Sequence, residues 1–208
     1  MSEDVSPETQ ACDRFDQYYQ AGNAPWEIDQ VQPELRALAE AEAIVGDVLD
    51  MGCGSGENSV YLAERGHMLW GIDISPVAIA KAQAKAKERH VDATFITGSA
   101  LELEVLGEGF HTVIDFAMFH VLDDAQRQIY LKGLHHVMFP NSRLYLLCFS
   151  ELEPEGWGPR RVQKSEIRHL FTAQNGFKVK DIKPARYLLK ERPEGVQAWL
   201  AKIICIEN

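Results

Sequence analysis

The chain has 208 residues, of which 46% are hydrophobic and 25% are charged, a composition typical of one folded α/β domain rather than of a disordered chain. Its 31 acidic side chains outnumber 21 basic ones, giving a formal charge of −10, and this disfavours a nucleic-acid partner because phosphates are bound by lysine and arginine. No apolar run reaches the roughly 20 residues that span a bilayer, and the acidic N-terminus lacks a secretory pattern. We therefore expect a cytoplasmic protein that does not insert in membranes.

Short apolar strands and helices alternate along the chain. Strands are expected at residues 45–51, 67–72, 93–97, 110–115, 143–149, 177–189 and 196–206, and helices at 58–65, 76–89, 123–137 and 165–172. Ser75, Ser165 and either Asp123 or Asp124 are the expected N-caps. The alternation predicts a mostly parallel sheet with helices on both faces. The last two strands, joined by the turn-rich segment 191–195, predict an antiparallel pair at one edge.

The N-terminal segment, residues 1–43, precedes the first strand and is mostly helical in character. It could form a lid over a ligand site, or it could only pack against the sheet, and both interpretations stay open. Residues 44–208 carry the alternating pattern. Because no repeat or linker separates the two segments, we expect one domain overall.

A glycine-rich loop follows the first strand. Gly52, Gly54 and Gly56 stand at alternate positions, which lets the backbone turn tightly and approach a ligand closely. The second strand ends at Asp73, 17 residues beyond Gly56 and close to the roughly 20-residue spacing of a ribose-binding carboxylate. The loop and this acid together predict a nucleoside-containing ligand.

The spacing and charge of the loop restrict which nucleoside it binds. The pattern is G-x-G-x-G rather than the dinucleotide fingerprint G-x-G-x-x-G, and the chain has no G-x-x-x-x-G-K-[ST] loop. Asp50 and Glu57 place negative charge on both sides of the loop. That charge disfavours a pyrophosphate and suits a ligand with sulfonium and ammonium groups.

These segments resemble class I S-adenosylmethionine-dependent methyltransferases. Residues 48–56 (VLDMGCGSG) are similar to motif I of that family and residues 71–75 (GIDIS) to motif II, while 98–101 (GSAL) and 113–116 (VIDF) match the adenine and fourth-strand motifs. The resemblance implies a Rossmann-like seven-stranded, mostly parallel sheet with an antiparallel C-terminal strand pair, helices on both faces and an N-terminal helical lid. Four further segments resemble a group of small-molecule methyltransferases that includes thiol, halide, thiopurine and heterocyclic-toxin methyltransferases. These segments are residues 24–28, 119–121, 148–150 and 157–161.

The resemblance implies S-adenosylmethionine as the cofactor and assigns roles by position. The backbone of residues 52–54 would hold its methionine end, Asp73 would bind the ribose, and Trp26 would close over it. The expected cofactor-binding residues are Trp26, Asp50, Gly52, Cys53, Gly54, Asn58, Asp73, Ile74, Ser99, Ala100 and Phe116.

Three positions depart from the family pattern. Ser99 stands where many relatives have Asp, and its hydroxyl can accept a hydrogen bond from the adenine amine without carrying charge. Asp29 stands where relatives often have Gly, which bears on the geometry of the lid. The usual Pro-Gly-Gly before the fifth strand is Pro140-Asn141-Ser142, and Asn tolerates the positive φ that such a turn needs.

His120 is the candidate catalytic residue. It follows the carboxyl end of the fourth strand, where open α/β sheets place their ligands, and a near-neutral pKa would suit a general base. A base is needed only when the acceptor arrives protonated. The alternative is that His120 only caps or packs the following helix.

Aromatic and basic side chains could form the acceptor pocket, although core packing or solvent exposure explains each of them as well. The expected pocket residues are Tyr18, Tyr19, Phe119, Trp157 and Arg160. No metal is expected, because the four cysteines lie far apart and form no C-x-x-C pair.

The sequence thus predicts methyl transfer to oxygen, sulfur or nitrogen of a small aromatic or heterocyclic compound, a thiol or a halide, by in-line displacement. One alternative is a regulatory or accessory protein that binds the cofactor without turnover, and another is a nicotinamide-dependent oxidoreductase. The expected partner is the small-molecule acceptor, with the protein a monomer or a homodimer. The acceptor itself is not determined by the residues.

Overall fold

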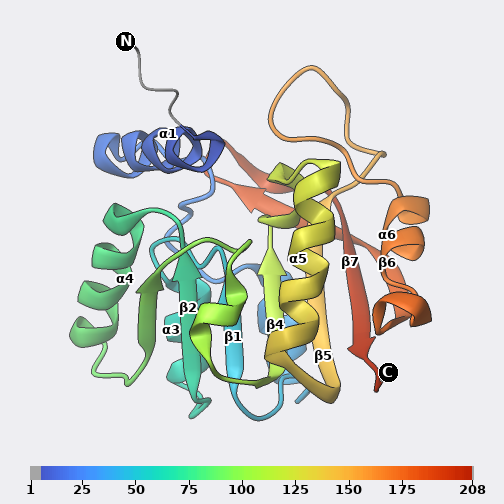
Figure 1. Cartoon of the computed structure of the whole chain (residues 1–208). Coiled ribbons are helices and arrows are strands. Elements are labelled where there is room, and N and C mark those ends of the chain that lie inside the picture. Colours follow the sequence, from blue (N-terminus) through green and yellow to red (C-terminus); the bar gives the residue numbers. More distant parts are fainter. Residues whose placement is uncertain (1–5, 208) are drawn as a thin grey trace.

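The computed structural model describes residues 6–207 and contains a seven-stranded sheet in the order β3-β2-β1-β4-β5-β7-β6 (Figure 1). The strands are β1 (Val48–Met51), β2 (Leu69–Asp73), β3 (Thr94–Thr97), β4 (Phe110–Phe116), β5 (Met138–Phe149), β6 (Phe177–Leu189) and β7 (Arg192–Cys205). The first five strands run parallel, and β7 pairs antiparallel with both β5 and β6. The seven predicted strands and their edge pair are confirmed.

Two strand ends differ from the prediction. The turn expected at 191–195 is wrong, because Arg192 already pairs with Leu189 and only Lys190 and Glu191 connect β6 to β7. The fifth strand begins earlier, at Met138, directly after the preceding helix. Asn141 lies within it at φ 67°, the conformation anticipated where relatives have Gly.

The helices begin where local capping groups permit. They are α1 (Pro7–Ala21), α2 (Pro33–Glu40), α3 (Glu57–Ala63), α4 (Pro76–Glu88), α5 (Asp124–Val137) and α6 (Lys164–Leu170), with short 3-10 turns η1 (Leu103–Leu106), η2 (Phe119–Val121) and η3 (Ala173–Asn175). Ser75 caps α4 by accepting from the N–H of Ala78 at 3.0 Å, and Asp123 caps α5. The predicted cap Ser165 is wrong, because it lies inside α6, whose N-cap is Gln163.

Two apolar clusters lie on opposite faces of the sheet. One joins the sheet to α5 and α6 and contains Phe110, Tyr130 and Ile167. The other joins it to α2, α3 and α4 and contains Leu35 and Val60. This is the layered arrangement that a mostly parallel sheet requires, with helices on both faces.

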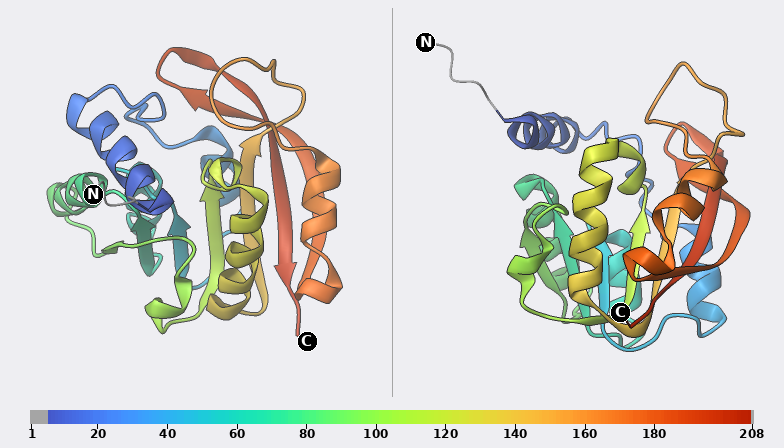
Figure 2. Two further views of the ribbon diagram at one scale, coloured as in Figure 1. Left: turned by 45° about the horizontal axis from the view of Figure 1, so that its top comes forward. Right: turned by 45° about the vertical axis from the view of Figure 1, so that its right-hand side comes forward.

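Two segments rise above the carboxyl-terminal edge of the parallel strands. Helix α1 lies over β1 and β2 and next to the start of α4, and the irregular segment 150–163 lies over β4 and β5 (Figures 1 and 2). Ligands of open α/β sheets bind at this edge. Both segments therefore border the expected site.

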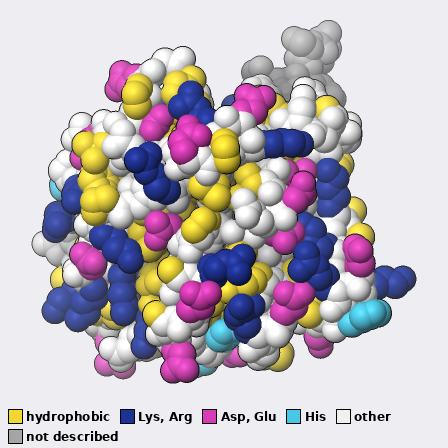
Figure 3. All heavy atoms as spheres, turned by 180° about the vertical axis from the view of Figure 1, so that it is seen from behind, with side chains coloured by type: hydrophobic (Ala, Val, Ile, Leu, Met, Phe, Trp, Pro, Cys, Tyr) yellow, Lys and Arg dark blue, Asp and Glu magenta, His cyan; other side chains and the backbone are white. Residues whose placement is uncertain are grey.

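Charged side chains are distributed over the visible surface (Figure 3). On the face seen in Figure 3, acidic and basic side chains are interspersed. None of the described helices is long and apolar enough to cross a membrane.

Candidate cofactor and acceptor site

The glycine loop joins β1 to α3 at the carboxyl edge of the sheet. Gly52, Gly54 and Gly56 all have positive φ, at 67°, 56° and 81°. A Cβ on Gly52 would lie 2.9 Å from the Cβ of Met118, and one on Gly54 would lie 2.7 Å from the hydroxyl of Tyr19. Glycine is therefore required both by the backbone conformation and by the close approach of these two neighbours.

The N–H groups at the start of this loop point into the protein. Those of Gly52 and Cys53 donate to the carbonyl of Ile72 at 2.8 and 3.0 Å, and that of Gly54 donates to Asp73 Oδ2 at 2.9 Å. These donors are not free to bind an anion such as a pyrophosphate. Backbone contacts to a ligand here would come from carbonyl oxygens, which suit the ammonium group of a methionine end.

Buried carboxyl groups surround the loop. Asp50 accepts a hydrogen bond from Ser59 Oγ at 2.6 Å, and burial raises its pKa to about 7. Asp73 accepts one backbone N–H on each oxygen, from Gly54 and from Ser75, both at 2.9 Å. Each of its oxygens keeps a lone pair for a ribose hydroxyl. The concentration of negative charge fits a cationic nucleoside such as S-adenosylmethionine.

The acid at the end of β4 has a structural role. Asp115 accepts N–H bonds from Met118 at 2.9 Å and Phe119 at 3.1 Å, and its other oxygen accepts from the Tyr130 hydroxyl at 2.8 Å. These bonds fix the turn from β4 into η2. The turn places Phe116 beside the glycine loop and His120 in the middle of η2.

Helix α1 and the segment after it cover the loop. The indole N–H of Trp26 donates to the Tyr19 hydroxyl at 2.8 Å, which brings both rings together over Gly54. The backbone carbonyl of Tyr19 accepts from Lys81 Nζ at 2.7 Å, and Asp16 accepts from the hydroxyl of Ser75. These contacts attach the N-terminal segment to the ends of β2 and the start of α4.

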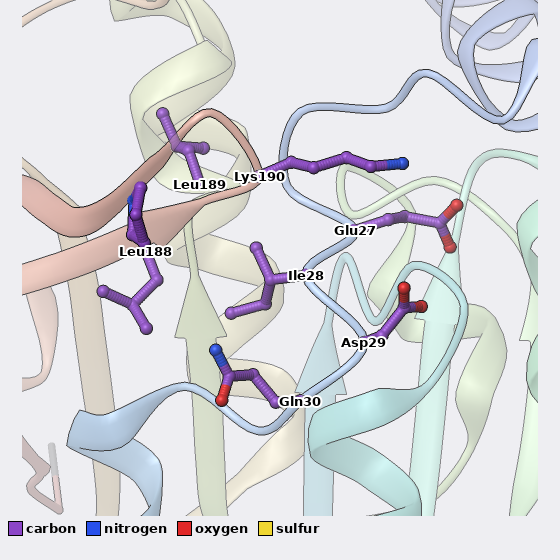
Figure 4. A pocket seen from close by; sticks show the side chains of 8 residues that line it. Glu27, Ile28, Asp29, Gln30, Leu188, Leu189 and Lys190 are labelled. Carbon is purple, nitrogen blue, oxygen red and sulfur yellow. The ribbon is translucent and has the colours of Figure 1, made fainter.

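The cavity enclosed by these residues is small. It measures about 60 Å³ and is lined by Tyr19, Trp26, Glu27, Ile28, Asp29, Gln30, Gln32, Gly52, Cys53, Gly54, Ser55, Glu57, Asn58, Lys85, Phe116 and Tyr187. A second cavity of about 120 Å³ shares residues 27–30 with it and continues to Leu188, Leu189, Lys190 and Pro193 (Figure 4). Ligand pockets generally measure about 300–1,000 Å³, so both cavities are smaller than a typical nucleoside pocket.

Segment 27–30 contains a residue with positive φ. Asp29, at the position where the resemblance predicted Gly, adopts φ 53°. Asp is one of the few residues other than Gly that tolerates this conformation. In Figure 4, Ile28 points toward Leu188 and Leu189, whereas Glu27 and Asp29 point the other way.

The expected adenine end lies after β3. Ser99 Oγ donates to Glu8 Oε1 at 2.7 Å, and the carbonyl of Ile74 accepts from Cys12 Sγ at 3.2 Å. Ala100 packs at the edge of the core on the α5 side. Residues from α1 therefore contact the ends of both β2 and β3.

The near-neutral pKa expected of His120 is wrong. Its Nδ1 accepts a hydrogen bond from the backbone N–H of Phe149 at 3.1 Å, and only 4% of the residue is exposed. Burial, together with the positive charges of Arg127 and Arg161, lowers the pKa of the imidazole to about 3. The hydrogen bond of this buried ring runs to the end of β5, and Arg127 of the following helix α5 is close enough to affect its pKa.

Three of the predicted pocket residues lie near the glycine loop or near His120. Tyr19 lines the cavity at the glycine loop, and Tyr18 packs on Trp26. Trp157 packs on Phe149, with ring centroids 5.6 Å apart, and belongs to an aromatic cluster near His120.

Two predicted pocket residues line neither of the two cavities described above. Phe119 is fully buried in the core on the α5 side, where it packs against Tyr130 and Phe171. Arg160 is paired on the surface with Asp124 at 2.5 Å and with Glu166. In both cases the side chain is held by neighbours outside the expected site.

Several residues of the site were missed. Tyr187 and Gln32 line the cavity, and Glu8 contacts Ser99. No local pattern in the sequence marks them. Tyr187 lies in an edge strand and Glu8 in the first turn of α1, and only tertiary packing brings them to the glycine loop and to β3.

Comparisons with known proteins identify the family and the fold. The family described as a methyltransferase domain matches residues 48–141. A 2-heptyl-1-hydroxyquinolin-4(1H)-one methyltransferase from Mycobacteroides abscessus is 35% identical over 169 residues, covering 80% of this chain and 74% of that protein.

Two solved structures share the fold. One, solved for the conversion of a disulfide bond into a thioacetal group during echinomycin biosynthesis, is 29% identical with a TM-score of 0.84, covering 95% of this chain and 94% of that chain. The other is 1,6-didemethyltoxoflavin-N1-methyltransferase from Burkholderia thailandensis with bound 1,6-didemethyltoxoflavin and S-adenosylhomocysteine. It is 20% identical with a TM-score of 0.75, covering 100% of this chain and 93% of that chain.

The quinolone methyltransferase resembles this chain over most of both sequences, which is sufficient to show the family. This result favours a methyltransferase over the nicotinamide-dependent oxidoreductase considered above. The chain therefore belongs to the S-adenosylmethionine-dependent methyltransferases of class I, in the group whose members include small-molecule methyltransferases.

Proposed function

We propose that this enzyme methylates an oxygen, sulfur or nitrogen atom of a small aromatic or heterocyclic acceptor, and that the acceptor binds as an anion. S-adenosylmethionine supplies an electrophilic methyl carbon on a sulfonium. The acceptor atom forms a bond to that carbon while the carbon–sulfur bond breaks and its electron pair stays on sulfur. The protein's tasks are to align the reactants and to exclude water.

The proposal that the acceptor binds as an anion depends mainly on the hydrogen bond from the backbone N–H of Phe149 to His120. A neutral imidazole has one donor and one acceptor nitrogen. Because Nδ1 accepts from the Phe149 N–H, the proton lies on Nε2. His120 therefore offers an N–H donor to a bound acceptor, and a donor stabilises an anion but does not remove a proton.

Other titratable groups near the loop are poorly placed to act as a base. Asp50, whose pKa is about 7, is buried and accepts a hydrogen bond from Ser59. Tyr187 lines the cavity, but burial raises the pKa of this phenol, so it stays protonated near neutral pH. An acceptor that is already ionised needs neither group.

The aromatic cluster beside His120 supports a flat acceptor. The ring of Phe149 has its centroid 5.6 Å from that of Trp157 and 5.9 Å from that of Tyr187. The guanidinium of Arg161 lies 4.9 Å from the centroid of Trp157 and 5.3 Å from that of Phe149, and it adds positive charge at this end. The names of two relatives, a hydroxyquinolone methyltransferase and a didemethyltoxoflavin methyltransferase, identify aromatic heterocycles as their acceptors.

The N-terminal segment 1–43, described here from residue 6, acts in this proposal as a lid on the domain formed by residues 44–208. The contacts of Tyr19 and Trp26 above Gly54 support that role. Closure would exclude water from the methyl group during transfer.

The experiment measures kcat/KM of the acceptor against pH, at saturating S-adenosylmethionine, for a series of hydroxylated heterocycles and thiols with different pKa values. If the acceptor must arrive ionised, each profile rises tenfold per pH unit and levels off at the pKa of that acceptor. Detection of the methylated product separates an enzyme from a protein that only binds the cofactor. An inflection at one fixed pH for all acceptors would reveal a base on the enzyme and overturn the anionic acceptor.

A further inference from the structure

The carboxylate of Glu8 lies against the segment that follows β3. Ser99 Oγ donates to Glu8 Oε1 at 2.7 Å and accepts from the N–H of Leu101 at 3.1 Å. The single hydroxyl proton of Ser99 is thus used by Glu8. No salt bridge within residues 6–207 neutralises this carboxylate.

The order of the strands shows which part of the cofactor meets Glu8. The glycine loop follows β1, Asp73 ends β2 and Ser99 follows β3, and these three strands are neighbours in the sheet. The N–H of Gly98 donates to the carbonyl of Asp73 at 2.9 Å, so the segment after β3 lies beside the ribose position. A nucleoside with its amino-acid end at the loop and its ribose at Asp73 must direct its base toward Ser99 and Glu8.

We propose that Glu8 is the residue that selects adenine by accepting a hydrogen bond from its exocyclic amine. This inference rests on the placement of the cofactor in the proposed function. Ser99 has no proton left to donate, and its remaining lone pair is a weaker acceptor than a carboxylate. Because Glu8 belongs to α1, the same bond would couple recognition of the base to closure of the N-terminal segment.

The selectivity follows from the chemistry at position 6 of the purine. Adenine carries an amine there, which donates to a carboxylate. In the 6-oxo base, hypoxanthine, a carbonyl oxygen would face the carboxylate without a proton between them. Glu8 is partly buried, and two acceptors that face each other without a proton disfavour the wrong ligand more than a missing contact alone.

The test is calorimetric binding of S-adenosylhomocysteine and of its 6-oxo analogue, S-inosylhomocysteine. The wild-type protein should prefer the amine by about 100-fold or more. Glu8→Gln should bind S-adenosylhomocysteine about 10- to 100-fold more weakly and should lose most of the preference, because its amide can donate to the 6-oxo group. Ser99→Ala is the matched control: it removes the contact of Glu8 but keeps the carboxylate, and the preference should persist.

Two outcomes overturn the assignment of Glu8. If Glu8→Gln weakens both ligands equally, Glu8 only attaches α1 to Ser99. If it changes neither affinity, Glu8 does not contact the base. Failure of the wild-type protein to bind either ligand would instead contradict the placement of the cofactor. A thermal denaturation curve of each variant shows that the affinities refer to folded protein.

Discussion

The Nδ1 atom of His120 accepts a hydrogen bond from the backbone N–H of Phe149 at 3.1 Å, which joins η2 to the end of β5. A histidine held in this way has a structural bond on one nitrogen and a potential ligand contact on the other. Its buried ring also makes an edge contact with Phe149, with centroids 4.7 Å apart. Stability and activity should therefore respond differently to different replacements of this residue.

We predict that the substitution His120→Ala destabilises the protein by about 1–3 kcal/mol, because it leaves the Phe149 N–H buried without an acceptor. Asn, whose side-chain oxygen can take the place of Nδ1, should recover part of that loss in chemical denaturation. Transfer to an anionic acceptor should fall about 10- to 100-fold in His120→Ala through loss of the Nε2 donor. A selective loss of about 10²–10⁴-fold for protonated acceptors, with anionic ones unaffected, would restore the role of general base.

The stability of the His120 variants should also depend on pH. The pKa of His120 is about 3 in the folded protein, below its value of about 6.5 in an unfolded chain, so only the unfolded state takes up a proton between these values. The wild-type protein loses this stabilisation as the pH falls below about 6.5. The stability advantage of the wild type over His120→Asn should shrink from pH 7 to pH 5, and an unchanged difference would show that His120 does not titrate in this way.

Replacement of Asp73 should weaken cofactor binding. Asp73→Ala removes the bonds to the ribose hydroxyls and should reduce the affinity for S-adenosylhomocysteine about 10- to 100-fold, with Asp73→Asn less affected because one acceptor oxygen remains. The alanine variant should also melt at a lower temperature, because the N–H groups of Gly54 and Ser75 lose their acceptor. Wild-type affinity in both variants would show that Asp73 only supports the loop.

Binding of S-adenosylmethionine should release protons through Asp50. Its pKa is about 7 in the ligand-free protein, so the carboxyl group is partly protonated near neutral pH. A nearby cation favours the ionised form, and the affinity should therefore rise with pH between about 6 and 8. Calorimetry in two buffers of different ionisation enthalpy measures the release. Asp50→Asn should bind more weakly and release fewer protons, whereas an equal release would place the titrating group elsewhere.

The bond between Trp26 and Tyr19 should slow the loss of bound cofactor. Trp26→Phe keeps an aromatic ring but removes the N–H that donates to the Tyr19 hydroxyl at 2.8 Å. Stopped-flow dissociation of S-adenosylhomocysteine should become up to about tenfold faster, as expected for one neutral hydrogen bond. Tyr18→Phe is the matched control, since Tyr18 packs on Trp26 but takes no part in this bond. Equal rates in the Trp26 variant and the wild type would argue against a lid.

Local patterns in the sequence determined most of the architecture. Apolar runs of strand length, the cap and proline at Ser75-Pro76 and the alternation of strands with helices predicted the sheet, its edge pair and the start of α4. The glycine loop and Asp73 were predictable for the same reason. Their spacing along one strand–turn–helix–strand unit is a local property of the chain.

Only the tertiary structure decided the state of the site residues. His120 lies 29 positions from its partner Phe149, and Ser99 lies 91 positions from Glu8, so no local pattern predicts either bond. The pKa of His120 depends on its burial and on the charges of Arg127 and Arg161 around it. Phe119 and Arg160 had residue types suited to a pocket, yet the direction of each side chain is set by the elements that pack around it. Burial, long-range hydrogen bonds and the local electric field arise only when distant segments meet, and these three determine what a side chain in the site can do.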